Sequence, residues 1–581
     1  MTYRAPLRDI RFALDHMVEA GALAGLYPEL TPELVDAILG EAGRFAGEVV
    51  APINAPGDRA GCRLESDKVT TAPGYREAYR QFVAGGWNGI GAPVEFGGQG
   101  LPKVVACAAE EMWHGASMAF GLAPMLTQGA IELLTHYGTE GQRHRYLPKL
   151  VSGAWTGTMN LTEPQAGSDV GALKARAMRT ADGTYRIKGT KIFITWGEHD
   201  LAENIVHLVL ARLPDGPAGT KGISLFLVPK FLVNPDGTLG ARNDVRCLSI
   251  EHKLGIHGSP TCVMAYGEGE GAVGELVGEE HGGMRAMFTM MNNARLGVGL
   301  EGVGIAEAAT QRALAYARER VQGRPLGQAG AILGHPDVAR MILTMKALTS
   351  AARAICYATA RAIDEARAVA NDADRAAAQA RADFLTPIAK AFSTDVGVEV
   401  ASLGVQVHGG IGYIEETGAA QLYRDARIAP IYEGTNGIQA LDLVARKLGL
   451  LGGETVRGLI AEIFETAAAL GRSGDGALSA ASPDLAAAAE AVHESSAYLL
   501  SSQARAPADS LSGASPYLRL AGLALGGHFL ARGALSEQDE PWRRMAVFYL
   551  RRLLPEAQAL KRAILAGGEA LANLDPADLA P

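Results

Sequence analysis

Glu433 is the residue of this sequence whose neighbours best suit a general base. Apolar Ile431 and aromatic Tyr432 precede it, and Gly434 follows it. Apolar neighbours disfavour the charged form of a carboxylate, which raises its pKa toward the range that suits a general base. The glycine lets the backbone approach a ligand closely and leaves a main-chain N–H free to donate. A loop glutamate that caps the next helix has the same local sequence, so both interpretations stay open at this point.

Two helical runs must hold this glutamate in place. A charged run ends at Pro430, because the residue before a proline is pushed out of the α region. A second run with helical spacing starts near Ile438 and carries Leu441 and Val444. Glu433 is therefore predicted to lie on a short loop between two helices.

A second candidate segment, residues 159–171, is rich in small and hydroxyl side chains. Thr162, Gly167 and Ser168 belong to it. Such a loop presents backbone N–H groups and hydroxyls to carbonyl or phosphate oxygens. A purely structural turn explains the same composition equally well.

Side chains that suit phosphate binding recur at two helix ends. Arg320 and Gln322 stand at the end of one helical run, where an arginine can clamp phosphate oxygens. Gln406 precedes Gly409 and Gly410 in a glycine-rich break between other helical runs. Each segment alone is more often a solvated helix end.

Two apparent motifs lack the context that their chemistry needs. Residues 297–302 match the dinucleotide fingerprint GxGxxG, but the sequence before them is helical and no strand precedes them. Closely packed helices explain these small residues better. His252 and His257, near Glu251, have no zinc-binding spacing around them. We therefore expect neither a Rossmann unit nor a metal site.

Length and composition bound the class of protein. A chain of 581 residues is too long for one core, so we expect about three or four domains or subdomains. The net charge of -9 argues against a nucleic-acid-binding protein. The 5 cysteines are dispersed and form no CxxC pair, which predicts a reducing compartment and mostly buried thiols. The sequence shows no signal-peptide pattern near Met1 and no apolar stretch that spans a bilayer, so we expect a cytoplasmic protein.

The pattern divides the chain into five segments and predicts a mixed, mostly α fold. Residues 1–35 form an amphipathic extension that must pack on its own body or on a partner. A helical domain is expected over residues 36–155. Short β-branched runs separated by turns predict a small antiparallel barrel or sandwich over residues 156–280. Helical spacing returns over residues 281–448, and an additional helical domain is expected over residues 449–581.

Taken together and in this order, the motifs resemble the acyl-CoA dehydrogenase family over residues 36–448. The resemblance implies an N-terminal helical domain, a central small β-barrel or sandwich and a C-terminal four-helix bundle. The extension and the tail resemble a longer subgroup of that family with an extra C-terminal helical domain. The motifs that carry it are LTEP and GSD within residues 161–169, KIFIT at 191–195, the segment after Arg320, Gln406 with its Gly-Gly pair, and IYEGT at 431–435.

The resemblance also implies an activity and a set of site residues. The activity is the FAD-dependent oxidation of an acyl-CoA to the trans-2-enoyl-CoA, in which Glu433 removes the α-proton and the β-hydrogen leaves as hydride to flavin N5. Substrate contacts would come from Ser168, Arg295, Tyr432 and Gly434. Cofactor contacts would come from Leu161, Thr162, Gly167, Ser168, Phe193, Thr195 and Thr435, and, from a neighbouring subunit, Arg320, Gln322, Gln406, Gly409 and Gly410.

Partners follow from the same resemblance, which implies a homodimer and an electron-transfer flavoprotein as electron acceptor. No nucleic acid and no membrane span are expected. Two alternatives stay open. One is a flavin oxidase or monooxygenase on the same scaffold, and the other is a nucleic-acid-associated flavoprotein that uses the tail. Residues 449–581 hold 11 Lys and Arg against 15 Asp and Glu, which counts against the second alternative. Acyl-chain length is not predicted.

Overall fold

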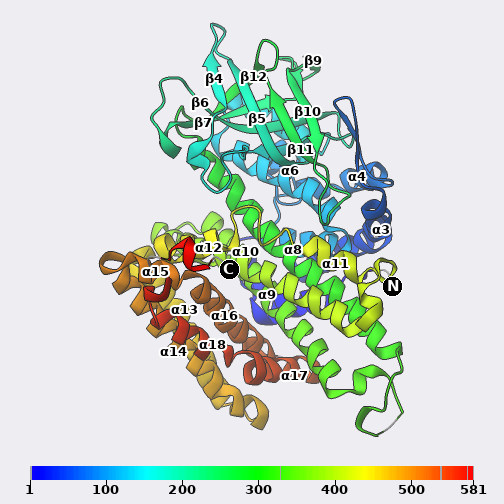
Figure 1. Ribbon diagram of the computed structural model, residues 1–581, viewed down its shortest axis with the longest axis vertical. Helices are drawn as coiled ribbons and strands as arrows, with labels where there is room; N and C mark the ends of the chain where they lie inside the picture. Colours follow the sequence, from blue (N-terminus) through cyan, green and yellow to red (C-terminus); the bar gives the residue numbers. More distant parts are fainter. Residues whose placement is uncertain (1–2, 328, 537–538, 572–573, 580–581) are drawn as a thin grey trace.

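Helix α8 (Gly283–Glu319) connects the β domain to the helical bundle. It starts against the β domain and runs through the bundle (Figure 1). The structure is a computed structural model that describes residues 3–327, 329–536, 539–571 and 574–579. The β domain lies at one end in Figure 1, and the additional helical domain lies beside the bundle at the other. The prediction of a mixed, mostly α fold is confirmed.

Capping residues that are visible in the sequence start helices of the N-terminal domain. Thr31 accepts a hydrogen bond of 3.2 Å from the Leu34 N–H, and Pro32 occupies the first turn. Thr139 and Gln142 form a capping box at α7. The helices of this domain are α2 (Pro32–Phe45), α3 (Ala51–Ala60), α4 (Tyr75–Ala84), α5 (Lys103–Ala116), α6 (Met118–Tyr137) and α7 (Glu140–Val151), with a hairpin of β1 (Arg63–Glu65) and β2 (Lys68–Thr70) after α3.

The central domain contains a small closed barrel. Its strands are β3 (Trp155–Asn160), β4 (Arg176–Arg179), β5 (Tyr185–Thr195), β6 (Asn204–Arg212), β7 (Ile223–Pro229), β10 (Val245–Ile250), β11 (Thr261–Tyr266) and β12 (Ala272–Val277), beside a hairpin of β8 (Phe231–Val233) and β9 (Leu239–Arg242). Strand β5 pairs with β12, β12 with β7 and β7 with β6, and β4 joins β6 back to β5.

One detail of the barrel differs from the antiparallel arrangement that the sequence predicted. Strand β3 pairs with β6 in parallel along its whole length, and β4 touches β6 in parallel at one residue pair. Strand β3 follows α7 directly, so it enters the sheet from the helical domain rather than through a hairpin turn. Turn residues predict antiparallel neighbours only, because a parallel pair needs a long crossover.

The long helices of the bundle are α8, α9 (Pro336–Ala368) and α10 (Asp372–His408), with the shorter α11 (Ala419–Ala426) and α12 (Asn436–Asp442) beside them. The GxGxxG match lies inside α8. A Cβ atom at Gly299 would lie 2.7 Å from the Ala389 carbonyl oxygen, and one at Gly302 would lie 2.2 Å from that of Ser393. These glycines therefore let α8 and α10 pack closely, as predicted.

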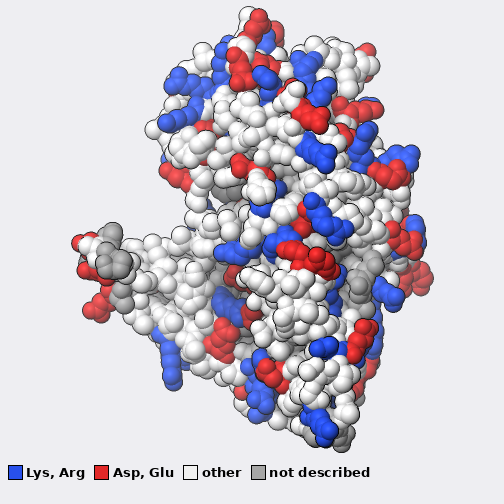
Figure 2. Space-filling model, turned by 45° about the vertical axis from the view of Figure 1, so that its right-hand side comes forward, with Lys and Arg blue, Asp and Glu red and all other residues white. Residues whose placement is uncertain are grey.

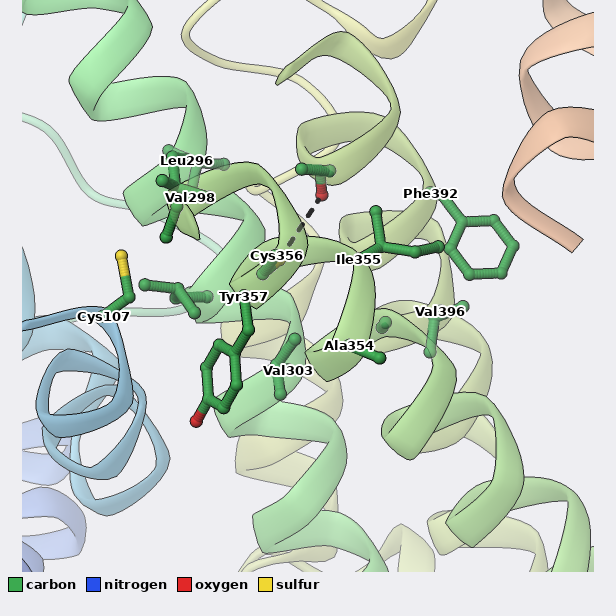
Figure 3. Packing of buried hydrophobic residues seen from close by; sticks show 14 of the residues in the cluster. Cys107, Leu296, Val298, Val303, Ala354, Ile355, Cys356, Tyr357, Phe392 and Val396 are labelled. Atoms are coloured by element: carbon green, nitrogen blue, oxygen red, sulfur yellow. Dashed lines mark hydrogen bonds between the residues drawn. The ribbon is translucent and has the colours of Figure 1, made fainter. Parts of the chain in front are cut away.

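Aliphatic and aromatic side chains fill the space between these helices (Figure 3). Val298 from α8, Ile355 and Tyr357 from α9 and Phe392 from α10 are all buried there. The Cys356 thiol lies 3.4 Å from the Ser393 hydroxyl, and burial raises its pKa to about 12. This thiol is thus a core group, as the dispersed cysteines predicted.

The additional helical domain packs on α9 and α10. Leu518, Leu520 and Leu554, three apolar positions of the tail, are buried in its core. Arg519 reaches Glu399 on α10 at 3.2 Å. The helices are α13 (Glu454–Gly471), α14 (Gly476–Arg505), α15 (Pro507–Ser512), α16 (Ala514–Ser536), α17 (Glu540–Phe548) and α18 (Glu556–Leu565).

The N-terminal extension packs on its own chain. Its helix α1 (Leu7–Phe12) continues into a π-helical turn over Ala13–Met17. Ile10, Leu14 and Met17 are buried. The Phe12 ring stacks on the Trp542 ring of the additional domain with the centroids 4.0 Å apart. The sequence did not indicate whether the extension packs on its own chain or on a partner. These contacts show that it packs on its own chain.

The residues that the structure describes include no apolar membrane-spanning helix and no cluster of metal-ligating side chains. No described helix is both long and apolar enough to cross a membrane. No group of three or more His, Cys, Asp or Glu side chains within the described ranges is arranged to hold a metal ion. His257 instead contacts the Lys253 carbonyl oxygen at 2.8 Å, and its ring stacks on that of His252. Figure 2 shows basic and acidic side chains interspersed on one face of the molecule.

Candidate active site

The loop between α11 and α12 carries Glu433 in an uncommon backbone conformation. Glu433 has a φ angle of 56°, and Gly434 after it has a φ of 82°. Glycine adopts this left-handed region readily, but a glutamate rarely does. Strained backbone of this kind persists only where the surroundings hold it, and it is concentrated at functional sites.

Hydrogen bonds from two side chains hold this loop. The Lys390 Nζ atom, on α10, donates to the Gly434 carbonyl oxygen at 3.0 Å and to the Asn436 side-chain oxygen at 2.8 Å. The Gln439 amide donates to the Glu433 carbonyl oxygen at 3.2 Å and to that of Gly434 at the same distance. The carbonyl groups of the strained turn therefore have fixed partners.

Thr435, predicted to contact the cofactor, also has a structural role. Its hydroxyl accepts a hydrogen bond of 3.2 Å from the Ile438 N–H and caps α12. The cap fixes where the helix begins, at Asn436, three residues after Glu433. The glutamate itself is not the helix cap, which removes the simplest structural explanation for it.

The surroundings of Glu433 give it the acidity of a base that works at neutral pH. Burial raises the pKa of its carboxyl to about 7, although nearby Arg295 and Lys390 act in the opposite direction. The side chain keeps part of its surface exposed. Arg295 on α8 is itself buried and lies 3.4 Å from Asp442. The loop thus combines a poised carboxylate with two fixed cations.

A second buried carboxyl lies next to this loop. The Tyr432 hydroxyl donates a hydrogen bond to Oε2 of Glu301 on α8. The pKa of Glu301 is raised to about 7, mainly by burial, with the neighbouring Glu433 acting in the same direction and His114, the Tyr432 hydrogen bond and Lys390 acting against it. Sequence reasoning did not single out this residue.

The loop after β3 is anchored by a buried ion pair. Lys191 on β5 donates to Glu163 Oε1 at 2.8 Å and to the Leu161 carbonyl oxygen at 2.9 Å. The Ile192 N–H donates to the Thr162 carbonyl oxygen at 2.9 Å. The predicted residues Gly167 and Ser168 lie exposed beyond this anchor. The loop and β5 therefore form one fixed platform.

Phe193 stands on this platform as an exposed aromatic side chain. Its φ angle of 60° lies in the left-handed region, at a bulge where the pairing of β5 with β11 shifts. The side chain is 58% exposed. The next predicted residue, Thr195, accepts a hydrogen bond of 2.8 Å from the Thr158 hydroxyl through its carbonyl oxygen. A bulged strand that holds an aromatic ring in solvent is typical of a ligand-facing wall.

The remaining predicted residues gather at the far end of α8. Tyr316 stacks on His408 with ring centroids 4.6 Å apart, which brings the segment after α8 beside the end of α10. Arg320 donates to the Gln322 side chain at 3.0 Å. Gln406, Gly409 and Gly410 lie at the end of α10, and Cβ atoms at both glycines would meet open space. We call Arg320, Gln322, Gln406, Gly409 and Gly410 the far-end set.

The two sets of predicted cofactor residues fit the two ends of FAD. The platform offers an aromatic wall and hydroxyls to a ring system, and the far-end set offers an arginine and open glycine backbone to a pyrophosphate. Helix α8 has 37 residues, so its first residue, Gly283 beside β7, lies about 55 Å from its end next to Arg320 at 1.5 Å per residue.

Three residues around Glu433 escaped sequence reasoning. Lys390 is a lone cation in an apolar helical run, and Glu301 is a lone acid inside the GxGxxG match. A charged residue in a helix that is otherwise apolar is almost never buried without a partner, and that rule was the available signal. Gln439 had no comparable signal, because a glutamine at a helix start is common.

Family models match four stretches of the chain. The model "Acyl-CoA dehydrogenase, N-terminal domain" matches residues 33–154, "middle domain" residues 158–267 and "C-terminal domain" residues 281–449. The model "Acetyl-CoA dehydrogenase C-terminal like" matches residues 459–575.

Individual relatives cover most of the chain. The 3-methylmercaptopropionyl-CoA dehydrogenase of Ruegeria pomeroyi is 50% identical over 546 residues, which are 93% of this chain and 92% of that protein. A butyryl-CoA dehydrogenase of Syntrophomonas wolfei is 37% identical over 80% of this chain and 78% of its own. The structure of an acyl-CoA dehydrogenase complexed with FAD from Bacillus anthracis has the same fold, with a TM-score of 0.75 and 22% identity over 94% of this chain and 90% of its own.

Proposed function

Because the chain belongs to the acyl-CoA dehydrogenase family, whose members are FAD-dependent oxidoreductases, we propose that it converts an acyl-CoA to the trans-2-enoyl-CoA with Glu433 as the general base. The observation that carries the residue assignment is the strained loop that holds a carboxyl with a pKa of about 7 beside Arg295.

The proposed mechanism starts from the weak acidity of the α-proton of a thioester. Glu433 in its ionised form accepts this proton, and the Glu433 N–H donates to the thioester carbonyl oxygen, where negative charge develops. FAD supplies the electron acceptor for the β-hydrogen and its electron pair. Arg295 and Lys390 favour the ionised carboxylate before the transfer, and the apolar loop around it limits access of water.

The cofactor is proposed to lie between two subunits of a homodimer. The platform of one subunit, Leu161 to Ser168 with Phe193 and Thr195, would hold the ring system, and the far-end set of the other would hold the pyrophosphate. The separation of the two sets along α8 supports this arrangement. Exposed apolar side chains near the far-end set, including Tyr413 and Ile414, also favour a partner surface.

The substrate is proposed to be a short acyl-CoA, with 3-methylmercaptopropionyl-CoA as the first candidate. The 50% identity to the Ruegeria pomeroyi enzyme over nearly the whole of both chains supports this choice. We further propose an electron-transfer flavoprotein as the physiological acceptor and the cytoplasm as the location, which the buried free thiols of Cys107, Cys262 and Cys356 suit.

Anaerobic bleaching of the bound flavin tests the proposal. Purified protein should release FAD and not FMN, and 3-methylmercaptopropionyl-CoA and butyryl-CoA should bleach it faster than palmitoyl-CoA. Reduced enzyme in air should consume oxygen slowly, whereas an oxidase would consume it at the rate of turnover. A protein that no acyl-CoA bleaches would contradict the proposed activity.

A further inference from the structure

Glu301 and Tyr432 form a contact that the proposed reaction does not use. Tyr432 directly precedes the base, and its hydroxyl donates to Oε2 of Glu301 across 131 residues of sequence. Glu301 is 0% exposed. Its other oxygen, Oε1, has no hydrogen-bond partner within the described chain. A fully buried carboxyl with half of its acceptors unused is costly, so its presence needs a reason.

Ionisable groups face Glu301 from each neighbouring element. His114 on α5 lies near it, and the His114 Nε2 atom is 3.5 Å from Glu110 Oε1. Lys390 on α10 and Glu433 on the loop also act on its charge. Both ring nitrogens of His114 and Oε2 of Glu110 lack hydrogen-bond partners among the described residues. Tyr432 is therefore the neighbour that ties this buried group to the active site.

The contact attaches the loop before the base in sequence, whereas Lys390 attaches it after the base. Lys390 and Gln439 hold the carbonyl groups after the base, whereas the Glu301 carboxyl holds the side chain before it. The left-handed turn at Glu433 is thus clamped on both sides. Losing one clamp leaves the strained backbone free to relax, which moves the base away from its productive position.

We propose that Glu301 is a positioning residue for the reaction, which holds Tyr432 against α8 and thereby keeps Glu433 aimed at the substrate, with its own charge acting on the base. The inference rests on the proposed function, because it needs Glu433 to be the base. Glu301 also sets the charge near Glu433: when it is ionised, it opposes the ionisation of Glu433.

A double-mutant cycle with Glu301→Leu and Tyr432→Phe tests the clamp. Each single variant should lower the rate of anaerobic flavin bleaching about tenfold, and the double variant should lower it by no more than about twentyfold, because both remove the same contact. Saturating rates should fall more than the KM for the acyl-CoA rises. Glu416→Gln, at an exposed glutamate of the helical turn Glu415–Thr417, is the matched control and should bleach at the parental rate.

Glu301→Gln separates charge from shape, and it guards against misfolding of the leucine variant. It keeps an acceptor for Tyr432 but cannot ionise. The low-pH limb of its bleaching rate should therefore move to lower pH by roughly 0.5–1 unit, since a charge that opposes ionisation of the base is gone. A residue that only fills space would leave this limb unmoved.

The outcomes distinguish the two proposals. If Glu433→Gln bleaches at the parental rate, the base assignment fails whatever Glu301 does. If Glu433→Gln is inactive but Glu301→Leu bleaches at the parental rate, or if the two single effects multiply in the double variant, the clamp is wrong and the base assignment stands. If the low-pH limb of the flavin-bleaching rate does not shift in Glu301→Gln, the proposed effect of the Glu301 charge on Glu433 is wrong.

Discussion

Lys390 and Gly434 are joined by a hydrogen bond of 3.0 Å between the ammonium group and the carbonyl oxygen that follows the base. Burial lowers the pKa of Lys390 to about 8, so its charge persists at neutral pH and weakens above pH 8. A cation in this place has two effects. It holds the turn, and it favours the ionised form of Glu433.

Lys390→Met is expected to slow flavin bleaching and to shift its pH dependence. The bleaching rate of the parent should rise with pH through about 7, because Glu433 must lose its proton to act. Lys390 lowers the pKa of Glu433, so its loss raises that pKa and moves the limb to higher pH. Lys188→Met, at an exposed position on β5, should leave the profile unchanged. If the pH dependence of the bleaching rate stays in place or moves to lower pH, Lys390 does not lower the pKa of Glu433 as assigned.

Glu433→Gln should lower the bleaching rate by about 10²–10⁴, the usual cost of losing a positioned base. The glutamine keeps the size of the side chain, so FAD content and thermal stability should stay near the parental values. Acyl-CoA should still bind, because the variant removes a proton acceptor and no anchoring contact. The measurement is stopped-flow bleaching under anaerobic conditions. A variant that bleaches normally places the base elsewhere.

Mixing two inactive variants tests whether FAD sites are shared between subunits. One variant is Glu433→Gln, and the other is Arg320→Ala/Gln406→Ala, which should lose FAD. In a mixed symmetric dimer one site receives both defects and the other receives none. Random mixing should therefore restore about a quarter of the parental activity. If each chain held its own FAD, no activity would return.

Leu520→Ala should destabilise the additional domain, because Leu520 is 0% exposed. Deleting a buried leucine side chain leaves a cavity and typically costs about 2–5 kcal/mol. The melting temperature should fall accordingly. Leu511→Ala provides the matched control, since Leu511 is 47% exposed and its loss should cost about 0.5 kcal/mol or less. Equal effects of the two variants would show that the core assignment of the tail is wrong.

The parts of the site that a sequence reveals are the parts that are local in the chain. The residues around Glu433 are contiguous, so their order alone predicted a loop between helices, and α11 and α12 confirm it. The glycines of α8 were correctly attributed to helix packing, because the element before them had no strand pattern. Both inferences needed only neighbouring residues.

Contacts between distant segments could not be predicted in this way. Glu301 meets Tyr432, and Lys390 meets Gly434, only once α8 and α10 have packed side by side. The parallel pairing of β3 with β6 has the same cause, since neither strand sequence indicates which neighbour it will have. Burial of Glu301 also depends on three elements at once, and no window of sequence contains all three.

The stacking of Phe12 on Trp542 has a consequence in time. A ribosome adds about 5–20 residues per second, so on the order of 30–100 seconds pass between the synthesis of these two rings. During that interval the face of the Phe12 ring that Trp542 covers has no permanent partner. The extension can therefore complete its packing only after the additional domain has been synthesised, although its contacts with α2 and α9 can form earlier.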